Sequence, residues 1–502
     1  MESIFRRIEK CIKQTGELPK NFVLEEEKSG NGELYFAPGA LEGIIGHHTA
    51  IADENGDFIE ELNMYLGMDF ADALNSFEEK RAKGFKTATI RDGLLSYIMS
   101  HKQEYDPNRL GRLAVYFMEH GQKIESVKLG LTLLYPFDLH NNSMICYAFE
   151  LLGYCDEFTD YVILNAKGWP VEQQQELYFE LARKLHGWGK INAVEMMVAD
   201  TEEKKEWILC HGCKNDVMYA YLGYECAMNC DLFERLQKGN LSDEEFAGAS
   251  DIMSGLLDEG PCQGMSALDE PVALTLFYLE ECKKHNWDAV QVALITDIAA
   301  YFKESEIEDA RKIEPKVKEV MSRLDIHTFI IENVEKNTPQ CMRIAKMYDI
   351  DMSEHLLRLM KMDFEKYYKF CTYFMQDANR VDEFLDLCDR KINYDKYPNA
   401  MGNELGLGAV QGDIKLDMVV QYLHLHYGKG KLMIMTCIQS PITRWRTMAV
   451  KALLSWVKTS GKTLEEIDIN LYNEVKRVHV IESAKQLIPE WEKLLGYRSM
   501  NE

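Results

Sequence analysis

The chain has 502 residues, of which 46% are hydrophobic and only 12 are proline, and its formal net charge is −25. This composition excludes an intrinsically disordered chain, and the excess of carboxylates argues against a protein that coats nucleic acid, because phosphate would be repelled. No stretch approaches the roughly 20 apolar residues of a membrane span, and the N-terminus lacks the apolar core of a secretory signal. The 13 cysteines form no dense framework, so we expect reduced thiols in a cytoplasmic protein.

Helical periodicity dominates the chain, and strand signals are scarce. The segment from Gly30 to Tyr35 looks most extended, and a short N-terminal hairpin is an option there. Two apolar stripes have the spacing of one helix face, and Gly121 after the first is a natural C-terminal stop. The first stripe consists of Leu110, Leu113, Ala114, Phe117 and Met118, and the second of Trp445, Met448, Ala449, Ala452, Leu453 and Trp456.

Helix starts are marked by three candidate capping boxes, in which a hydroxyl and a carboxylate each satisfy a backbone N–H. These are Ser242 with Glu245, Ser305 with Glu308, and Thr463 with Glu466.

One helix–turn–helix pattern occurs three times, at residues 152–158, 228–233 and 379–384. In each, a Gly or Asn can end one helix, an Asp can cap the next, and a Phe can pack back on the hairpin. The connections between helices are short, which forces consecutive helices to pack antiparallel. These features predict an all-α fold, an α-solenoid in the form of a right-handed superhelix of degenerate helix hairpins.

One segment carries a resemblance to a known repeat family. Residues Ser440 to Leu454 place an Arg on a turn and then Ala and Leu at packing positions. This segment resembles the second helix of a HEAT-type repeat, although the match covers a single repeat. The resemblance implies a helical-repeat scaffold with a protein-binding surface, and it implies no catalytic residue.

The charge changes sign along the chain. Residues 415–502 carry 13 basic and nine acidic side chains, a net of +4, which leaves −29 for residues 1–414. The change falls near the glycine-rich stretch Gly402 to Gly412. We therefore expect an N-terminal capping region at 1–90, an acidic helical-repeat body at 91–412 and basic C-terminal helical repeats at 413–502.

Four cysteines form a candidate metal site: Cys210, Cys213, Cys226 and Cys230. Their spacing is close to patterns that hold tetrahedral zinc between two converging pairs of thiolates. The alternatives are a redox-active dithiol and simple packing of small apolar side chains in a hairpin core. We favour packing, because nothing else in the chain suggests a zinc module, and we expect no other cofactor.

Other candidate sites have weaker support. The carboxylates Asp156, Glu157 and Asp160, echoed at 382–386, resemble the helix-borne magnesium ligands of all-α terpenoid synthases, but acidic residues also favour a first helical turn. Gly406 to Gly412 lacks the preceding strand of a phosphate-binding loop. A calcium loop that starts at residues 53–57 is rejected, because Phe58 stands where glycine is required and Met64 where glutamate is required. The pairs His47–His48 and His424/His426 have no evident co-ligands.

The basic C-terminal end offers the predicted partner-binding residues, which are Arg444, Trp445, Arg446 and Lys451. We expect a non-catalytic helical-repeat scaffold that binds a protein partner, with an acidic one as an option at this end, whereas nucleic acid and membrane are not expected. The alternative is an all-α enzyme of the α/α-toroid kind with a carboxylate-lined acidic pocket. The sequence does not fix the oligomeric state.

Overall fold

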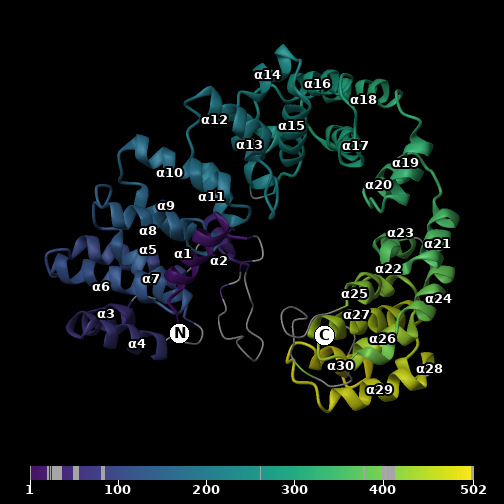
Figure 1. The fold of residues 1–502 in the computed structure, drawn as a ribbon. Coiled ribbons are helices and arrows are strands. Elements are labelled where there is room, and N and C mark those ends of the chain that lie inside the picture. Colours follow the sequence, from purple (N-terminus) through teal and green to yellow (C-terminus); the bar gives the residue numbers. More distant parts are fainter. Residues whose placement is uncertain are drawn as a thin grey trace. The chain divides into compact units, whose positions relative to one another are not determined.

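The computed structural model describes residues 2–19, 22, 24, 37–48, 56–80, 85–260, 262–376, 379–397, 402 and 413–498. Over these ranges the chain is helical and contains no β-strand (Figure 1), which confirms the all-α prediction. The hairpin considered at Gly30 to Tyr35 lies outside the described residues. No helix in the described ranges is long and apolar enough to cross a bilayer.

The chain divides into two compact units. Unit 1 contains the described residues up to Trp287 together with Asp297–Met321, and unit 2 contains Asp288–Thr296 and the described residues from Ser322 onward. The three predicted regions 1–90, 91–412 and 413–502 stay a prediction.

Most helices up to residue 321 belong to unit 1, and α17 contributes residues to both units. In chain order these helices are α1 (Ile4–Thr15), α2 (Ala40–His48), α3 (Gly56–Gly67), α4 (Phe70–Lys80), α5 (Thr87–Ser100), α6 (Pro107–His120), α7 (Ile124–Leu134), α8 (Ser143–Gly153), α9 (Asp156–Ala166), α10 (Val171–Lys184), α11 (Trp188–Met196), α12 (Glu202–Trp207), the π-helix η1 (Ile208–Gly212), α13 (Ala220–Asn229), α14 (Leu232–Lys238), α15 (Asp243–Leu256), η2 (Met265–Ala267), α16 (Pro271–Cys282), α17 (Ala289–Glu304), η3 (Ala310–Lys312) and α18 (Ile313–Met321).

The later helices belong to unit 2. They are α19 (Ile326–Glu335), α20 (Cys341–Met347), α21 (Ser353–Met362), α22 (Phe364–Tyr367), η4 (Tyr368–Phe370), α23 (Cys371–Met375), α24 (Val381–Lys391), η5 (Tyr394–Lys396), α25 (Ile414–Val420), η6 (Leu423–Leu425), α26 (Lys431–Ile438), α27 (Thr443–Ser460), α28 (Leu464–Ile467), α29 (Ile469–His479) and α30 (Ile488–Leu494).

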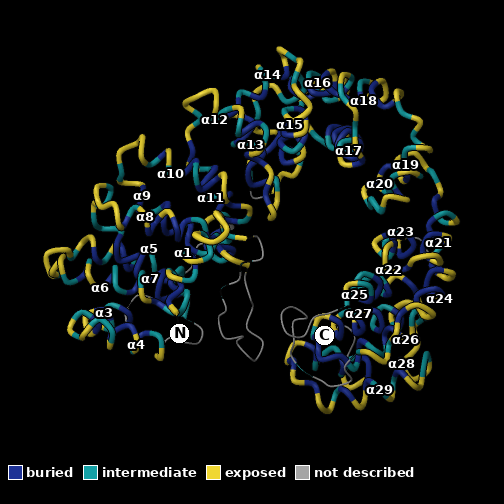
Figure 2. The backbone as a smooth tube through the Cα atoms, in the orientation of Figure 1, coloured by how far each residue is buried: buried dark blue, intermediate teal, exposed yellow. Residues whose placement is uncertain are grey.

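Helices pack mainly against close neighbours in the chain. In unit 1 the pairs α6–α7, α8–α9, α10–α11 and α13–α15 are in extensive contact, as are α26–α27 and α28–α29 in unit 2. Figure 2 shows buried and exposed residues alternating along individual helices. The first predicted stripe is buried in full on α6, and in the second, on α27, every member except Met448 is buried. The helix-face spacing therefore identified core residues correctly.

Two of the three predicted capping boxes are present. Ser242 begins α15 and Thr463 begins α28, and each exchanges hydrogen bonds with the Glu three residues later. The prediction at Ser305 is wrong. Its backbone N–H donates to the carbonyl of Tyr301 at 2.9 Å, so Ser305 follows the end of α17, and the next α-helix begins at Ile313.

The three predicted turns join α8 to α9, α13 to α14 and α23 to α24. The predicted capping role of the Asp residues is wrong, because the N-cap positions of α9 and α24 are Cys155 and Arg380, and Asp231 before α14 makes no side-chain cap bond. The Asp156 side chain is therefore free to reach another helix.

Candidate functional site

Helix α7 is buried along almost its whole length, and two of its buried residues, Glu125 and Lys128, are charged. A buried charge requires a partner. Glu125 accepts a hydrogen bond from the backbone N–H of Thr87 at 2.7 Å. The Lys128 side chain is 2% exposed, and its Nζ lies 2.6 Å from Glu42 Oε1 and 2.5 Å from Glu157 Oε1. This ammonium joins α2, α7 and α9 inside unit 1.

Glu42 in the first turn of α2 is only half satisfied. Its Oε1 accepts hydrogen bonds from Lys128 and, at 2.9 Å, from the hydroxyl of Tyr161. Its other oxygen, Oε2, is buried and has no hydrogen-bond partner. Burial alone would raise the pKa of Glu42, but the charge of Lys128, together with hydrogen bonds from Lys128, from the backbone of Glu42 and from Tyr161, holds the pKa below its usual value. Glu42 is therefore a charged carboxylate with one unused acceptor.

The three carboxylates of α9 that the sequence singled out reach three different partners. Asp156 Oδ1 accepts from the backbone N–H of Gly189 at 2.7 Å, which fixes the start of α11. Glu157 Oε2 accepts from the N–H of Gly39 at 3.0 Å, and Asp160 forms an ion pair with Arg91. The three side chains hold neighbouring helices together, and in the described part of the chain no three His, Cys, Asp or Glu side chains are placed to share a metal ion.

A cavity of about 180 Å³ lies beside this network. Its polar lining comes from four helices and the residue that follows α9, and Ile163, Leu164 and Met196 supply apolar wall. The polar residues are Glu42 and His47 of α2, Arg91 of α5, Asp160 of α9, Lys167, and Asn192 and Glu195 of α11. We call this space the α2–α11 cavity.

Glu195 is the most perturbed carboxyl at the α2–α11 cavity. Its burial raises its pKa to about 7, and the negative charges of Glu225 and Asp160 contribute. The closest basic nitrogen is Nε2 of His47, at 3.6 Å from Oε1, too far for a good hydrogen bond. A carboxyl that titrates near neutral pH inside a cavity is a common feature of functional sites.

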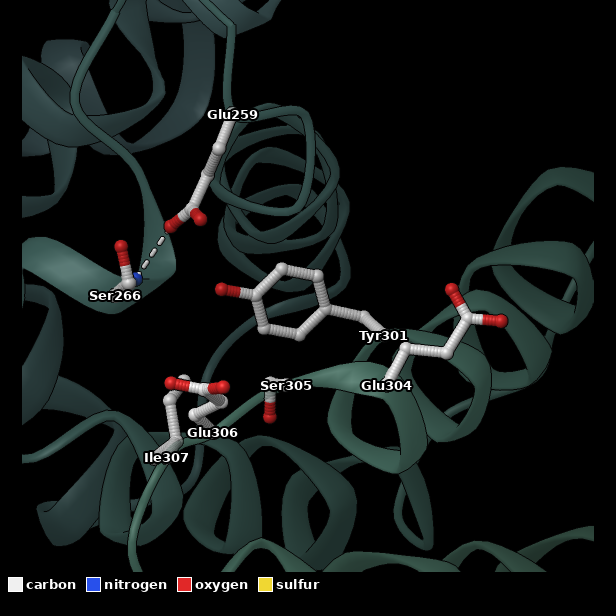
Figure 3. A pocket seen from close by; sticks show the side chains of 7 residues that line it. All are labelled: Glu259, Ser266, Tyr301, Glu304, Ser305, Glu306 and Ile307. Atoms are coloured by element: carbon white, nitrogen blue, oxygen red, sulfur yellow. Dashed lines mark hydrogen bonds between the residues drawn. The ribbon is translucent and has the colours of Figure 1, made fainter.

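A second and larger hollow, of about 510 Å³, lies between the end of α15 and the end of α17 (Figure 3). It is lined by Glu259, Ser266, Tyr301, Glu304, Ser305, Glu306 and Ile307. In Figure 3 the Tyr301 ring lies between Glu259 and Glu306, with Glu304 beyond it on the same helix. We call this space the acidic hollow.

The carboxylates of the acidic hollow are not used in ion pairs within the described part of the chain. Glu259 Oε1 accepts from the backbone N–H of Ser266 at 2.5 Å, but no Lys, Arg or His in the described part of the chain forms an ion pair with Glu259, Glu304 or Glu306. Burial and the nearby Glu259 carboxylate raise the pKa of Tyr301 to about 12. The Tyr301 hydroxyl therefore remains a donor, and the hollow has an excess of negative charge.

The four predicted zinc ligands pack into unit 1 around η1 and α13. Cys213, Cys226 and Cys230 are buried, and Cys210 is half-buried. Cys213 and Cys226 are in hydrogen-bonding contact, and this contact together with burial raises the pKa of Cys226. Cys213 also donates to the carbonyl of Asp251. The structure brings two of the four thiols together as neighbours, and the zinc site stays a prediction without support from this geometry.

The predicted partner-binding residues of α27 divide into two kinds. The side chains of Trp445 and Arg446 are buried, and Arg446 forms a bidentate ion pair with Glu482 inside unit 2. These two residues therefore belong to the core and not to an exposed binding surface. Arg444 and Lys451 are exposed, and Arg444 pairs with Asp417.

The structure also places some of the remaining candidate site residues. Asp382 lies 2.7 Å from Lys429 and Glu383 lies 2.7 Å from Lys361, so the echo motif forms surface ion pairs. The imidazoles of His424 and His426 contact different backbone carbonyls. Residues 403–412 and 53–55 lie outside the described residues, as does the side chain of His48.

Sequence reasoning missed Glu42, Lys128, Arg91 and Glu195. The one local signal was Lys128 itself, a charge near the start of the otherwise uncharged run from Val127 to Leu134. A charge on the buried face of a helix predicts a buried partner, but the partner's position in the sequence cannot be derived from this.

A comparison of the chain with protein-family models, with curated proteins and with solved structures finds no match.

Proposed function

We propose that this chain is a non-catalytic, α-solenoid-like helical scaffold that binds a protein partner, and that the acidic hollow takes up a basic side chain of that partner. The single observation that supports the proposal is a hollow beside the half-buried Tyr301 ring whose three lining carboxylates, Glu259, Glu304 and Glu306, form no ion pair in the described part of the chain. The contacts between helices adjacent in the chain support stacked hairpins. The specific HEAT-like repeat type stays a prediction.

The chemistry of the acidic hollow fits a lysine or arginine side chain. Such a side chain has an apolar stem, which can lie along Tyr301 and Ile307, and a charged end, which can reach Glu259, Glu304 or Glu306. A cation over an aromatic ring gains about 0.5–1 kcal/mol at an exposed site. The volume of about 510 Å³ exceeds the needs of one side chain and leaves room for adjoining backbone.

The overall charge supports a basic partner. At a net charge of −25 the chain attracts cationic proteins at long range and repels nucleic acid. The acidic partner suggested by the sequence depended on Arg444, Trp445, Arg446 and Lys451, of which two are buried and Arg444 is already paired. We therefore propose a basic partner in place of an acidic one.

We further propose a reducing compartment such as the cytoplasm, because all 13 cysteines are free thiols. The all-α enzyme with a carboxylate-lined pocket stays the alternative function, since it would use the same hollow.

Binding of short peptides tests the proposal. A fluorescein-labelled peptide of alternating Lys and Ala is titrated with the wild-type chain and with the triple variant E259Q/E304Q/E306Q, and anisotropy is measured at two salt concentrations. We expect the triple variant to bind about tenfold more weakly and with a smaller salt dependence. The matched control E172Q/E176Q/E180Q removes three carboxylates from α10 and should bind like the wild type. Equal affinity of the two triple variants would show that the acidic hollow does not bind the basic peptide.

A further inference from the structure

One face of α27 carries basic side chains along its length. Arg444, Lys451 and Lys458 follow one another at intervals of seven residues. Seven residues are close to two turns of an α-helix, so the three residues share a face, and adjacent members lie about 10 Å apart along the axis. All three are exposed, as is Lys462 just beyond the end of α27. We call Lys451, Lys458 and Lys462 the basic row.

The lysines of the basic row are not used in ion pairs within the described part of the chain. Arg444 on the same face pairs with Asp417, but no Asp or Glu side chain in those ranges pairs with any of the three lysines. The sequence explains this, because it has no acidic residue between Met418 and Leu464, although 82 of its 502 residues are Asp or Glu. The basic row therefore presents three positive charges that a surface with carboxylates can pair.

The chain itself carries a complementary surface. The acidic hollow of unit 1 has three exposed carboxylates that form no ion pair in the described part of the chain, and the basic row of unit 2 has three ammonium groups in the same condition. The charge of the sequence divides in the same way, with −29 over residues 1–414 and +4 over residues 415–502. A lysine of the basic row also has the apolar stem and the charged end that suit the hollow.

We propose that copies of this chain associate head to tail, with the basic row of one copy against the acidic hollow of the next. The inference rests on the proposed function, because it names a second copy as the source of the basic side chain that the hollow takes up. One lysine of the row enters the hollow along the Tyr301 ring, which lies between Glu259 and Glu306 in Figure 3. The other two lysines strengthen the attraction between the surfaces.

The contact joins two different surfaces, and this determines how the copies assemble. A dimer still has one free basic row and one free acidic hollow, so further copies add until a ring closes or the protein concentration limits growth. The average mass should therefore rise with protein concentration. An attachment of the basic row to the acidic hollow of the same chain would leave the mass independent of concentration.

Salt should weaken the association. Each copy has a net charge of −25, so copies repel one another at long range. At about 0.15 M salt this repulsion is largely screened beyond about 8 Å, whereas charges in contact are screened less. Salt added above this concentration acts mainly on the charges in contact, and it should return the chain to the monomer.

Sedimentation velocity over a range of protein concentrations, at about 0.15 M salt, tests the proposal. We expect the average mass of the wild-type chain to rise above that of the monomer, and K451E/K458E/K462E to need at least about tenfold higher concentration for the same rise. The control K346E/K369E/K391E changes the net charge equally, at three other exposed lysines of unit 2 that form no ion pair in the described part of the chain. It should associate like the wild type. A monomeric wild type, or equal association of the two triple variants, would overturn the proposal.

An exchange of charges locates the contact. E259K/E304K/E306K makes the hollow positive like the basic row, so this variant should stay monomeric alone, as K451E/K458E/K462E does. An equal mixture of the two variants should associate, because each hollow then meets a row of opposite charge on the other variant. All six substituted residues are exposed, so both variants should keep their helices, which circular dichroism checks. A mixture that stays monomeric while both variants are folded would contradict the proposal.

The labelled peptide of alternating Lys and Ala separates this inference from the proposed function. K451E/K458E/K462E keeps its acidic hollow and should bind the peptide as the wild type does at concentrations where the wild type is monomeric. An excess of the peptide should dissociate the wild-type oligomers, because it occupies the same hollow. If the wild type binds the peptide but never self-associates, the proposed function holds and the head-to-tail contact is wrong. If it neither binds the peptide nor self-associates, both are wrong.

Discussion

Arg446 has hydrogen-bond acceptors for all three guanidinium nitrogens. Nε and Nη2 donate to the two oxygens of Glu482 at 2.9 and 2.8 Å, and Nη1 donates to the carbonyls of Ser440 and Pro441. Glu482 also accepts from the indole N–H of Trp491 at 3.1 Å. Both side chains of the ion pair are fully buried, so the pair orients α27 against the segment that precedes α30.

At the same residue scale we predict that two arginine ion pairs contribute very different amounts to the free energy of unfolding. E482Q leaves the buried Arg446 without a counter-charge and should lower the free energy of unfolding by about 3–5 kcal/mol. R444A removes an ion pair at the surface and should lower the free energy of unfolding by about 1 kcal/mol or less. Urea denaturation followed by tryptophan fluorescence measures both. Similar losses for the two variants would contradict the burial of the Arg446–Glu482 pair.

Residue identity alone could not separate these two arginines. Arg444 and Arg446 lie two positions apart, about 200° around a helix, so only one of them can follow the apolar stripe of Trp445, Ala449 and Trp456. The sequence predicted that stripe correctly. It did not reveal that Arg446 adjoins the stripe, because its partner Glu482 lies 36 residues away.

Glycines allow close helix packing in unit 1. Gly223 of α13 and Gly255 of α15 face each other at a crossing, where a Cβ on Gly255 would lie 2.6 Å from the carbonyl oxygen of Tyr219. A Cβ on Gly223 would lie 2.6 Å from the carbonyl carbon of Gly255. Backbone cannot yield as a flexible side chain does, so neither position tolerates a methyl group without moving a helix.

At this element scale we predict that G255A destabilises the chain, because α13 and α15 must separate. Overpacking of this kind costs about 1–3 kcal/mol, measured as a lower free energy of unfolding in urea. The control is G67A at the end of α3, where a Cβ meets no atom within 4 Å. G67A should be neutral or slightly stabilising. Equal free energies of unfolding for G255A and G67A would show that α13 and α15 pack less closely than the structure shows.

Helix positions were more predictable than helix contacts. The buried stripes and the capping boxes at Ser242 and Thr463 depend on residues three or four apart, which the sequence displays directly. The pairing of Lys128 with Glu42 and Glu157 depends on how α2, α7 and α9 pack against one another. Glu42 and Lys128 are 86 residues apart in the sequence. No local pattern contains that information, so the α2–α11 cavity could not be predicted.

At the scale of the whole molecule, the negative charge of the chain and the acidic hollow both support the proposal of a basic partner. The net charge of −25 steers a basic protein toward the chain at long range. In the proposal, the hollow then offers short-range contacts from its lining residues Glu259, Glu304, Glu306 and Tyr301. Long-range electrostatic attraction alone would be screened by salt. In the proposal, the hollow also favours a basic side chain over other side chains.

Reversal of charge at the acidic hollow tests this account most directly. The variant E259K/E304K/E306K is titrated with two labelled peptides of equal length, one of alternating Lys and Ala and one in which Glu replaces every Lys. We predict that the wild-type chain prefers the Lys peptide and that the variant prefers the Glu peptide, by about tenfold in each case. If the variant keeps the wild-type preference for the Lys peptide, the acidic hollow is not where a basic partner binds.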